Sequence, residues 1–271
     1  MALKSLRIGC VKYLNARPLI HGWEGDVDFD HPSALCQRLA NGELDVALVS
    51  SFEFLRNPIY WIVDDVSISS DGRVYSVVVA HRGDISEINE IELDPASETS
   101  ANLLRCLLPE LGLNPRFAQP RTGVSPTVAE DTGRRAQLLI GDQAIRFRQE
   151  YVSEFSFLDL GEQWKKVVGL PFVYALWLIR PEVVNPKQIA NRLRALRDGN
   201  LFNLDDLVTE VVAGVGDPGH PKLNREFFLR YYREHLRFGF GEREKEGLRT
   251  FAKLCTTHGL IPKRDLAFSI V

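Results

Sequence analysis

The chain contains 271 residues, of which 45% are hydrophobic and 25% are charged, a composition that predicts a soluble globular protein large enough for two lobes. Its formal net charge of -3 argues against a nucleic-acid-binding surface. The N-terminus carries no long apolar segment, and no stretch approaches the roughly 18 apolar residues of a membrane span. We therefore expect a cytoplasmic protein without a signal peptide. Four scattered cysteines without a Cys-x-x-Cys pair predict buried, reduced thiols: Cys10, Cys36, Cys106 and Cys255.

The first third of the chain alternates short apolar runs with helical segments. Pro32 begins a helix in which Leu35 and Leu39 lie four residues apart, and Gly42 ends it. Alternation of this kind favours a mostly parallel sheet. Strands are expected at 6–11, 26–30, 44–50 and 74–80.

A second α/β unit begins near Ile91. A strand at 91–94 precedes a helix over 100–111, which carries leucines on one face and ends at Gly112. The stretch 114–134 is rich in Pro, Gly, Arg and Thr and is expected to be mainly loop or short helix. Further strands are expected at 137–141, 155–158 and 172–179.

Beyond residue 180 the apolar residues follow a helical period. Helices are expected to begin at Asn185–Pro186, near Asn203, around Phe227 and near Glu242. Two α/β units followed by helices predict two lobes with a ligand cleft between them, and the chain is expected to cross at strands 74–80 and 172–179. The predicted division gives a discontinuous lobe one, 1–80 with 180–271, and lobe two, 81–179.

Asn15 occupies a turn at the carboxyl end of the predicted first strand. Pro18 marks the start of a helix just after it, because proline has no N–H to lose in a first helical turn. In open α/β sheets ligands bind beyond the carboxyl ends of the strands, and an amide there both donates and accepts hydrogen bonds. Asn15 is therefore a candidate ligand contact, and the alternative is an Asx-turn that serves only the backbone.

Six segments in a fixed order along the chain carry a family resemblance. They are 11–19, 45–53, 68–76, 93–100, 140–144, and 159–164 leading to 169–173. Together they make the chain resemble the MqnA family, the chorismate dehydratases of the futalosine route to menaquinone. The resemblance implies a type II periplasmic-binding-protein fold, chorismate as substrate, and 3-(1-carboxyvinyloxy)benzoate and water as products, with no cofactor and no metal. Lys12 and Arg73 depart from the residues expected there and bear on the mouth of the cleft.

The implied substrate carries two carboxylates. It suits a cleft built from hydroxyls and helix N-termini, where free N–H groups and the helix dipole favour anions. Ser97, Thr99 and Ser100 open the predicted 100–111 helix and are candidates for binding one carboxylate. Ser50 and Ser51 end a predicted strand at the expected cleft edge and are further substrate-binding candidates. For all five residues the alternative is helix capping.

The implied reaction removes a ring proton and a neighbouring hydroxyl, and aromatisation drives it. Asn15 and Ser76 are the expected catalytic residues: Asn15 holds the leaving hydroxyl or orients the ring, and Ser76 faces either the ligand or solvent. Asp142 is a candidate substrate contact or general acid/base, and the alternative is a helix cap; beside a dianion its carboxylate requires a proton or a donor. None of the six histidines falls at the expected cleft centre. We therefore hypothesise that the enolpyruvyl carboxylate of the substrate takes the proton.

Two other classes of function stay open. A non-catalytic binding or sensor protein for small carboxylates has the same fold, although the missing signal peptide disfavours an exported one. The 1,4-dihydroxy-6-naphthoate synthase of the same pathway also has this fold, but its Ser/Thr-Pro-Cys-Pro-Asn type turn is absent here. Besides a small-molecule substrate we expect no nucleic-acid or membrane partner, and we expect a monomer or homodimer.

Overall fold

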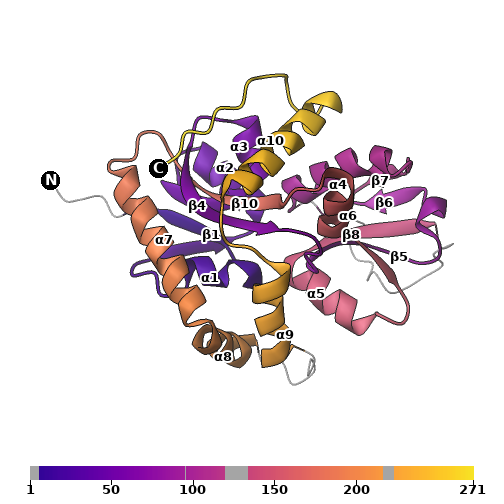
Figure 1. Cartoon of the computed structure of the whole chain (residues 1–271), viewed down its shortest axis with the longest axis horizontal. Coiled ribbons are helices and arrows are strands. Elements are labelled where there is room, and N and C mark those ends of the chain that lie inside the picture. The colour runs from indigo at the N-terminus through magenta and orange to yellow at the C-terminus, as the bar shows by residue number, and fades with distance from the viewer. Residues whose placement is uncertain (1–5, 95, 120–133, 216–222) are drawn as a thin grey trace.

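Two mixed, five-stranded sheets form the framework of the molecule (Figure 1). The computed structural model describes residues 6–94, 96–119, 134–215 and 223–271. In Figure 1 the first sheet and α7 lie on one side of the molecule, and the second sheet and α5 lie on the other. Helix α10 packs against both β10 of the first sheet and α4, so the C-terminal helices join the two halves.

The first sheet combines parallel strands with one reversed strand between β3 and β4. Strand β1 pairs in parallel with β2 and β3, whereas β10 is antiparallel to both β3 and β4. The run Val46–Val49 is completely buried, as expected of a strand covered on both faces. In sheet order the strands are β2 (Val27–Asp30), β1 (Ile8–Val11), β3 (Val46–Ser50), β10 (Phe172–Ile179) and β4 (Trp61–Ser70).

The second sheet follows the same plan. Strand β6 pairs in parallel with β7 and β8, and β5 is antiparallel to β8 and β9. In each sheet the antiparallel strand, β10 or β5, directly follows the segment that connects it to the other sheet. In sheet order the strands are β7 (Arg116–Ala118), β6 (Glu90–Glu92), β8 (Arg135–Ile140), β5 (Val77–His81) and β9 (Ser156–Asp159).

The helices begin and end at residues that suit helix termini. Pro32 opens α2, Ser97 caps α4 by accepting from the Ser100 N–H, and Gly169 ends α6 with φ +79°. The helices are α1 (Arg17–Ile20), α2 (Pro32–Ala40), α3 (Ser51–Arg56), α4 (Glu98–Glu110), α5 (Gly141–Glu150), α6 (Leu160–Val168), α7 (Pro186–Phe202), α8 (Leu204–Val215), α9 (Arg225–Arg230) and α10 (Glu242–Thr257), with 3-10 turns η1 (Leu14–Ala16) and η2 (Ile85–Glu87) and a π-helical turn η3 (Tyr231–His235).

The sequence does not predict strand β4, because two acidic residues interrupt its apolar pattern. Asp65 has φ +59°, and the register between β4 and β10 shifts near this point, between Leu176 and Leu178. The Arg197 side chain compensates by donating to the Asp65 carbonyl and, at 2.8 Å, to its carboxylate. Strand β7 is a second difference, since it lies in the stretch expected to be mainly loop, of which 120–133 lie outside the described residues.

The chain passes between the sheets at different places from those predicted. Strand β5 lies wholly in the second sheet and β10 wholly in the first, so neither strand is itself a crossing. The left-handed conformation of Tyr75, with φ +70°, interrupts the strand expected over 74–80, so β5 begins only at Val77. We propose that the lobes divide at 71–76 and 169–171, which assigns 77–80 to lobe two and 172–179 to lobe one.

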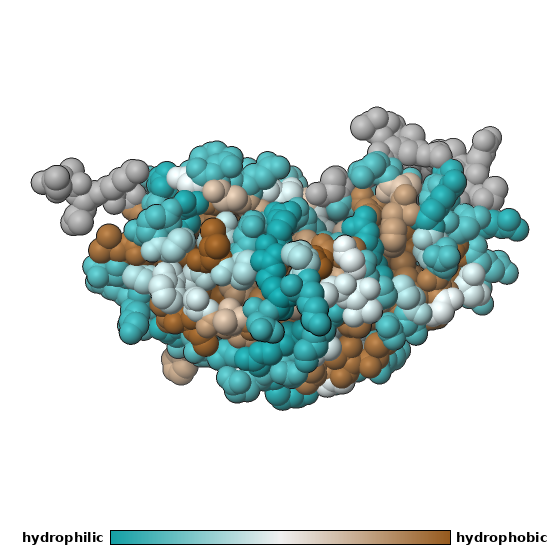
Figure 2. Space-filling model, turned by 90° about the horizontal axis from the view of Figure 1, so that it is seen from above, coloured by the Kyte–Doolittle hydropathy of each residue, from teal (hydrophilic) through white to brown (hydrophobic). Residues whose placement is uncertain are grey.

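The cysteines and the surface are those of an ordinary globular protein. All four cysteines are buried and free, as predicted, and the Cys106 and Cys255 sulfurs lie 3.8 Å apart between α4 and α10. Within the described residues, no helix is long and apolar enough to cross a membrane. Figure 2 shows hydrophobic residues in separate patches among hydrophilic ones on the face seen from above.

Candidate active site

A cavity lies between the two sheets, where several strands end. Val11, Ser50 and Ile140, the last residues of β1, β3 and β8, all contribute to its wall. The empty space in and around it, including the part open to solvent, is about 570 Å³. The rest of the wall consists of Tyr13, Asn15, Pro32, Ile68, Val74, Ser76, Val77, Ser97, Glu98, Thr99, Ser100, Gly141, Tyr174, Ala175 and Leu236.

Asn15 lies in the η1 turn and forms part of this cavity wall. Pro18 lies in the first turn of α1 directly afterwards, as the sequence predicts. The Asn15 Oδ1 atom is buried and has no hydrogen-bond partner among the described residues. A buried acceptor of this kind needs a donor, and a ligand hydroxyl in the cavity supplies one.

The turn that carries Asn15 is held from two sides. The Asp142 carboxylate accepts from the Leu14 N–H at 2.9 Å, and the Tyr232 hydroxyl donates to the Leu14 carbonyl at 2.8 Å. Asp142 does not line the cavity, and burial raises the pKa of its carboxyl group. It therefore contacts the Asn15 turn from behind rather than the cavity, and it does not cap α5 through its side chain.

A hydroxyl network joins α3 and α4 at one end of the cavity. The Ser50 and Thr99 hydroxyls are hydrogen-bonded, and Thr99 Oγ1 also accepts from the Phe52 N–H at 3.2 Å. The Ser51 hydroxyl donates to the Val173 carbonyl at 2.7 Å and does not line the cavity. Ser50 and Thr99 thus lie in the wall, whereas Ser51 fastens α3 to β10.

Two helices begin at the cavity wall. Ser97, Glu98, Thr99 and Ser100 belong to the cap and first turn of α4, and Gly141 is the first residue of α5. The positive end of each helix dipole therefore faces the cavity and favours an anionic group there. Of the residues predicted for carboxylate binding, Ser97, Thr99 and Ser100 are all brought to this wall.

Gly141 fits closely against Tyr13, and both residues line the cavity. Its φ is +56°, and an added Cβ would lie 2.9 Å from Cγ of the Tyr13 ring, so only glycine fits without displacement. The Tyr13 hydroxyl lies 3.3 Å from His31 Nδ1, and the exposed Lys12 amino group lies 2.9 Å from His31 Nε2. Lys12 and Arg73, the two departures noted in the sequence, are exposed and lie outside the cavity wall.

Ser76 lines the cavity directly before β5. Its hydroxyl accepts from the Tyr231 hydroxyl at 2.7 Å, and its carbonyl accepts from the Gly141 N–H at 2.8 Å. The preceding residue, Tyr75, is held by the buried Asp159 carboxylate, which accepts from the N–H groups of Val74 and Tyr75 at 3.0 and 2.8 Å. Ser76 is therefore fixed through its backbone and its side chain.

Comparisons with known proteins agree with this architecture. Residues 6–257 match the model of a family described as menaquinone biosynthesis. The chain belongs to this menaquinone biosynthesis family. It is similar to the chorismate dehydratase of Thermus thermophilus, with 31% identity over 264 residues that cover 91% of this chain and 93% of the relative. The predicted family is thereby confirmed.

Two solved structures establish the fold of this family member. A protein of Archaeoglobus fulgidus superimposes with a TM-score of 0.72 at 18% identity, covering 94% of this chain and 98% of the other. The periplasmic aliphatic sulphonate binding protein of Escherichia coli superimposes with a TM-score of 0.65 at 12% identity, covering 96% and 94%. The periplasmic-binding-protein-like fold predicted from the sequence is confirmed.

The described cavity wall of this family member contains no lysine, arginine or histidine. Its one carboxylic side chain is Glu98, which accepts from Arg56 at 2.9 Å through Oε1. The other oxygen, Oε2, is buried without a hydrogen-bond partner among the described residues. An anionic ligand must therefore be bound mainly by hydroxyls, amides and helix N-termini.

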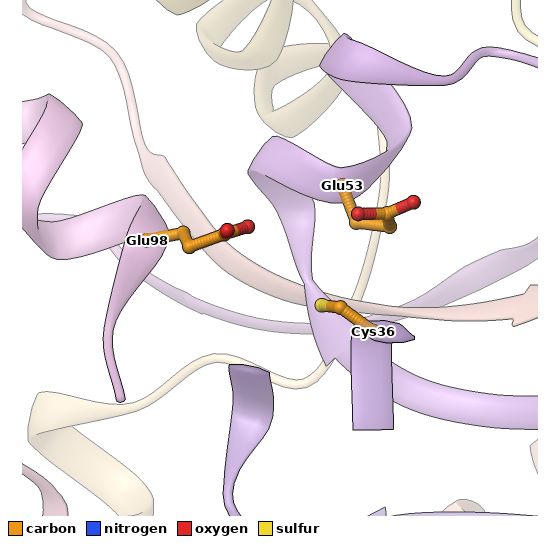
Figure 3. A group of neighbouring side chains, drawn as sticks. All are labelled: Cys36, Glu53 and Glu98. Atoms are coloured by element: carbon orange, nitrogen blue, oxygen red, sulfur yellow. The ribbon is translucent and has the colours of Figure 1, made fainter. Parts of the chain in front are cut away.

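Beside Glu98, the described residues include one group with the side chains of a metal site (Figure 3). Cys36 of α2, Glu53 of α3 and Glu98 of α4 place possible ligand atoms within 4.8 Å of one another. Arg56 donates to the carboxylates of both Glu53 and Glu98, so a guanidinium already occupies the position of a cation between them. An ion-pair bridge between α3 and α4 therefore explains why these side chains lie together.

Several residues of this site escape the sequence analysis. Tyr13, Glu98 and Tyr174 line the cavity, and Tyr231 supports Ser76 from the C-terminal helices. Glu98 lies inside the predicted Ser97–Ser100 segment, so the predicted site residues on either side of it are the signal that could have found it. Tyr231 follows the apolar period of its helix and is indistinguishable in sequence from a core residue.

Proposed function

We propose that this chain is a chorismate dehydratase, a carbon-oxygen hydro-lyase that converts chorismate to 3-(1-carboxyvinyloxy)benzoate and water in menaquinone biosynthesis. The observation that carries the proposal is a cavity whose wall combines two helix N-termini with a buried amide oxygen that has no hydrogen-bond partner among the described residues. The similarity to the Thermus thermophilus chorismate dehydratase supports it. We further propose a cytoplasmic monomer or homodimer that needs neither cofactor nor metal.

The two carboxylates of chorismate match the two helix N-termini. The α4 terminus offers the hydroxyls of Ser97, Thr99 and Ser100, and the α5 terminus begins at Gly141 in the same wall. Neutral donors and helix dipoles bind a dianion without a basic side chain. Ser50 extends the hydroxyl surface, whereas Ser51 and Asp142 act from behind the wall.

The chemistry is an elimination that yields an aromatic ring. The C–H bond on the carbon bearing the enolpyruvyl ether breaks, its electron pair becomes a ring double bond, and the neighbouring C–O bond breaks. The released hydroxide equivalent takes up a proton, so chorismate is converted to the substituted benzoate and one water. The Asn15 Oδ1 atom accepts from the departing hydroxyl and fixes its position, which lowers the barrier through orientation.

The proton acceptor in this proposal is the enolpyruvyl carboxylate of the substrate. The one carboxylic residue in the described wall, Glu98, is paired with Arg56. Asn15→Ala is expected to lower kcat at least about 100-fold, whereas Glu98→Gln retains measurable turnover. Exposed Asn191 on α7 supplies the control Asn191→Ala, with wild-type kcat expected. Wild-type kcat in Asn15→Ala, or complete loss in Glu98→Gln, contradicts the assignment.

The first experiment incubates the purified protein with chorismate and follows ultraviolet absorbance, with mass analysis of the product. Release of one water with formation of the substituted benzoate supports the dehydratase. Thermal stabilisation by chorismate without turnover identifies a carboxylate-binding protein instead. Turnover of a later pathway intermediate but not of chorismate identifies the related dihydroxynaphthoate synthase.

A further inference from the structure

Tyr231 donates a hydrogen bond to a hydroxyl that lines the cavity. Its O–H lies 2.7 Å from Ser76 Oγ, and both side chains are completely buried. Ser76 belongs to the wall, whereas Tyr231 lies behind it on the π-helical turn η3. Such turns are frequent at functional sites, because the extra residue redirects side chains.

The hydrogen-bonding capacity of Ser76 makes this contact directional. A serine hydroxyl has one proton to donate and two lone pairs to accept with. Because Tyr231 occupies a lone pair, the Ser76 proton is free to point elsewhere, and no acceptor for it is found among the described residues. The remaining direction is toward the cavity that Ser76 lines.

The surroundings of Tyr231 keep it in the role of donor. Its ring stacks on Phe227, with centroids 5.8 Å apart and planes 12° apart. Burial raises the pKa of Tyr231 well above its ordinary value, so the phenol stays protonated over the whole physiological range. Ser76 itself is anchored because its carbonyl accepts from the Gly141 N–H.

We propose that Tyr231 is a positioning residue that commits the Ser76 hydroxyl to donate to the departing hydroxyl oxygen of the ligand. The inference rests on the proposed dehydratase function. A leaving hydroxyl gains negative charge as its C–O bond breaks, so a fixed donor stabilises the transition state more than the ground state. Ser76 donates this hydrogen bond, and its hydroxyl carries its proton again when the reaction is complete.

A double-mutant cycle tests the proposal. Tyr231→Phe removes one oxygen and keeps the ring, and Ser76→Ala removes the donor. Each variant is expected to lower kcat by about tenfold with little change in KM, and the double variant is expected to match Ser76→Ala alone. A purely structural Tyr231 gives additive losses, or a lower Tm with unchanged kcat, and either result overturns the proposal. A rise in KM at constant kcat also overturns it.

Tyr60→Phe is the matched control, because Tyr60 is a buried tyrosine whose hydroxyl donates to Glu53 at 3.4 Å and does not line the cavity. Its kcat is expected to equal that of the wild type. If Tyr231→Phe fails to fold, wild-type kcat in Ser76→Ala still refutes the proposal. Absence of chorismate turnover in the wild type refutes the dehydratase and this inference together, whereas turnover that is insensitive to both substitutions refutes only the inference.

Discussion

At the scale of residues, the site is marked by polar atoms that the fold leaves incomplete. The Asn15 and Glu98 side chains each bury an oxygen without a partner in the described part of the chain, and both line the cavity. An unsatisfied buried acceptor costs about 1–3 kcal/mol, so a ligand that donates to it regains that amount on binding. Asn15 is therefore stabilised when the cavity is filled.

Asp142 connects this site to the pH dependence of stability. Burial raises the pKa of its carboxyl group, so the folded state binds the proton more tightly than the unfolded state does. Stability then falls as pH rises from the unfolded pKa through the raised folded pKa. Asp142→Asn keeps an acceptor for the Leu14 N–H but carries no charge. We expect it to raise the free energy of unfolding at pH 7.

Urea unfolding of wild type and Asp142→Asn at a series of pH values checks this expectation. The difference in free energy of unfolding between the two proteins should shrink as the pH falls toward the ordinary pKa of aspartate. The folded Asp142 carboxyl group is then protonated and therefore neutral, like the amide of the variant. A difference that stays constant with pH, or a less stable variant at pH 7, contradicts it.

At the scale of elements, the start of α6 shows how closely the segment between the sheets is packed. A Cβ on Gly161 would lie 2.4 Å from the Gly72 carbonyl, 2.7 Å from Ser70 Oγ and 2.8 Å from the Tyr174 hydroxyl. Gly161→Ala is therefore expected to destabilise the protein by about 1–3 kcal/mol, since α6 must move away from 70–72.

Gly199→Ala is the matched substitution, because Gly199 lies inside α7 with nothing near the added Cβ. Here alanine should stabilise by roughly 0.5–1 kcal/mol through its better helix propensity. Chemical denaturation measures both variants, and equal effects of the same sign refute the packing argument.

The same elements show why part of the structure is predictable from sequence. Strand β3 is evident because Val46–Val49 form an uninterrupted apolar run, and α2 is evident from Pro32 and Gly42. Strand β4 is hidden because its bulge depends on pairing with β10, which is distant in sequence. Asn15 could be placed by its position after β1, but the contact of Tyr231 with Ser76 exists only in the folded molecule.

At the scale of the whole molecule, the cavity joins residues of both sheets, so ligand binding stabilises them together. The reaction product, at one hundred times its Kd, should raise the free energy of unfolding by about 2.7 kcal/mol. Urea unfolding followed by tryptophan fluorescence and by circular dichroism measures this shift, and both signals should shift equally. A shift in only one signal indicates that the ligand stabilises one half alone.

The position of β10 between β3 and β4 also constrains how the protein is made. On the ribosome, β3 and β4 emerge before the whole second sheet, and the strand that pairs with both emerges after it. Until then their hydrogen-bonding edges lack the partner they have in the native state. The nascent chain thus depends on delayed completion of its first sheet, and it is most vulnerable to aggregation while the second sheet is being synthesised.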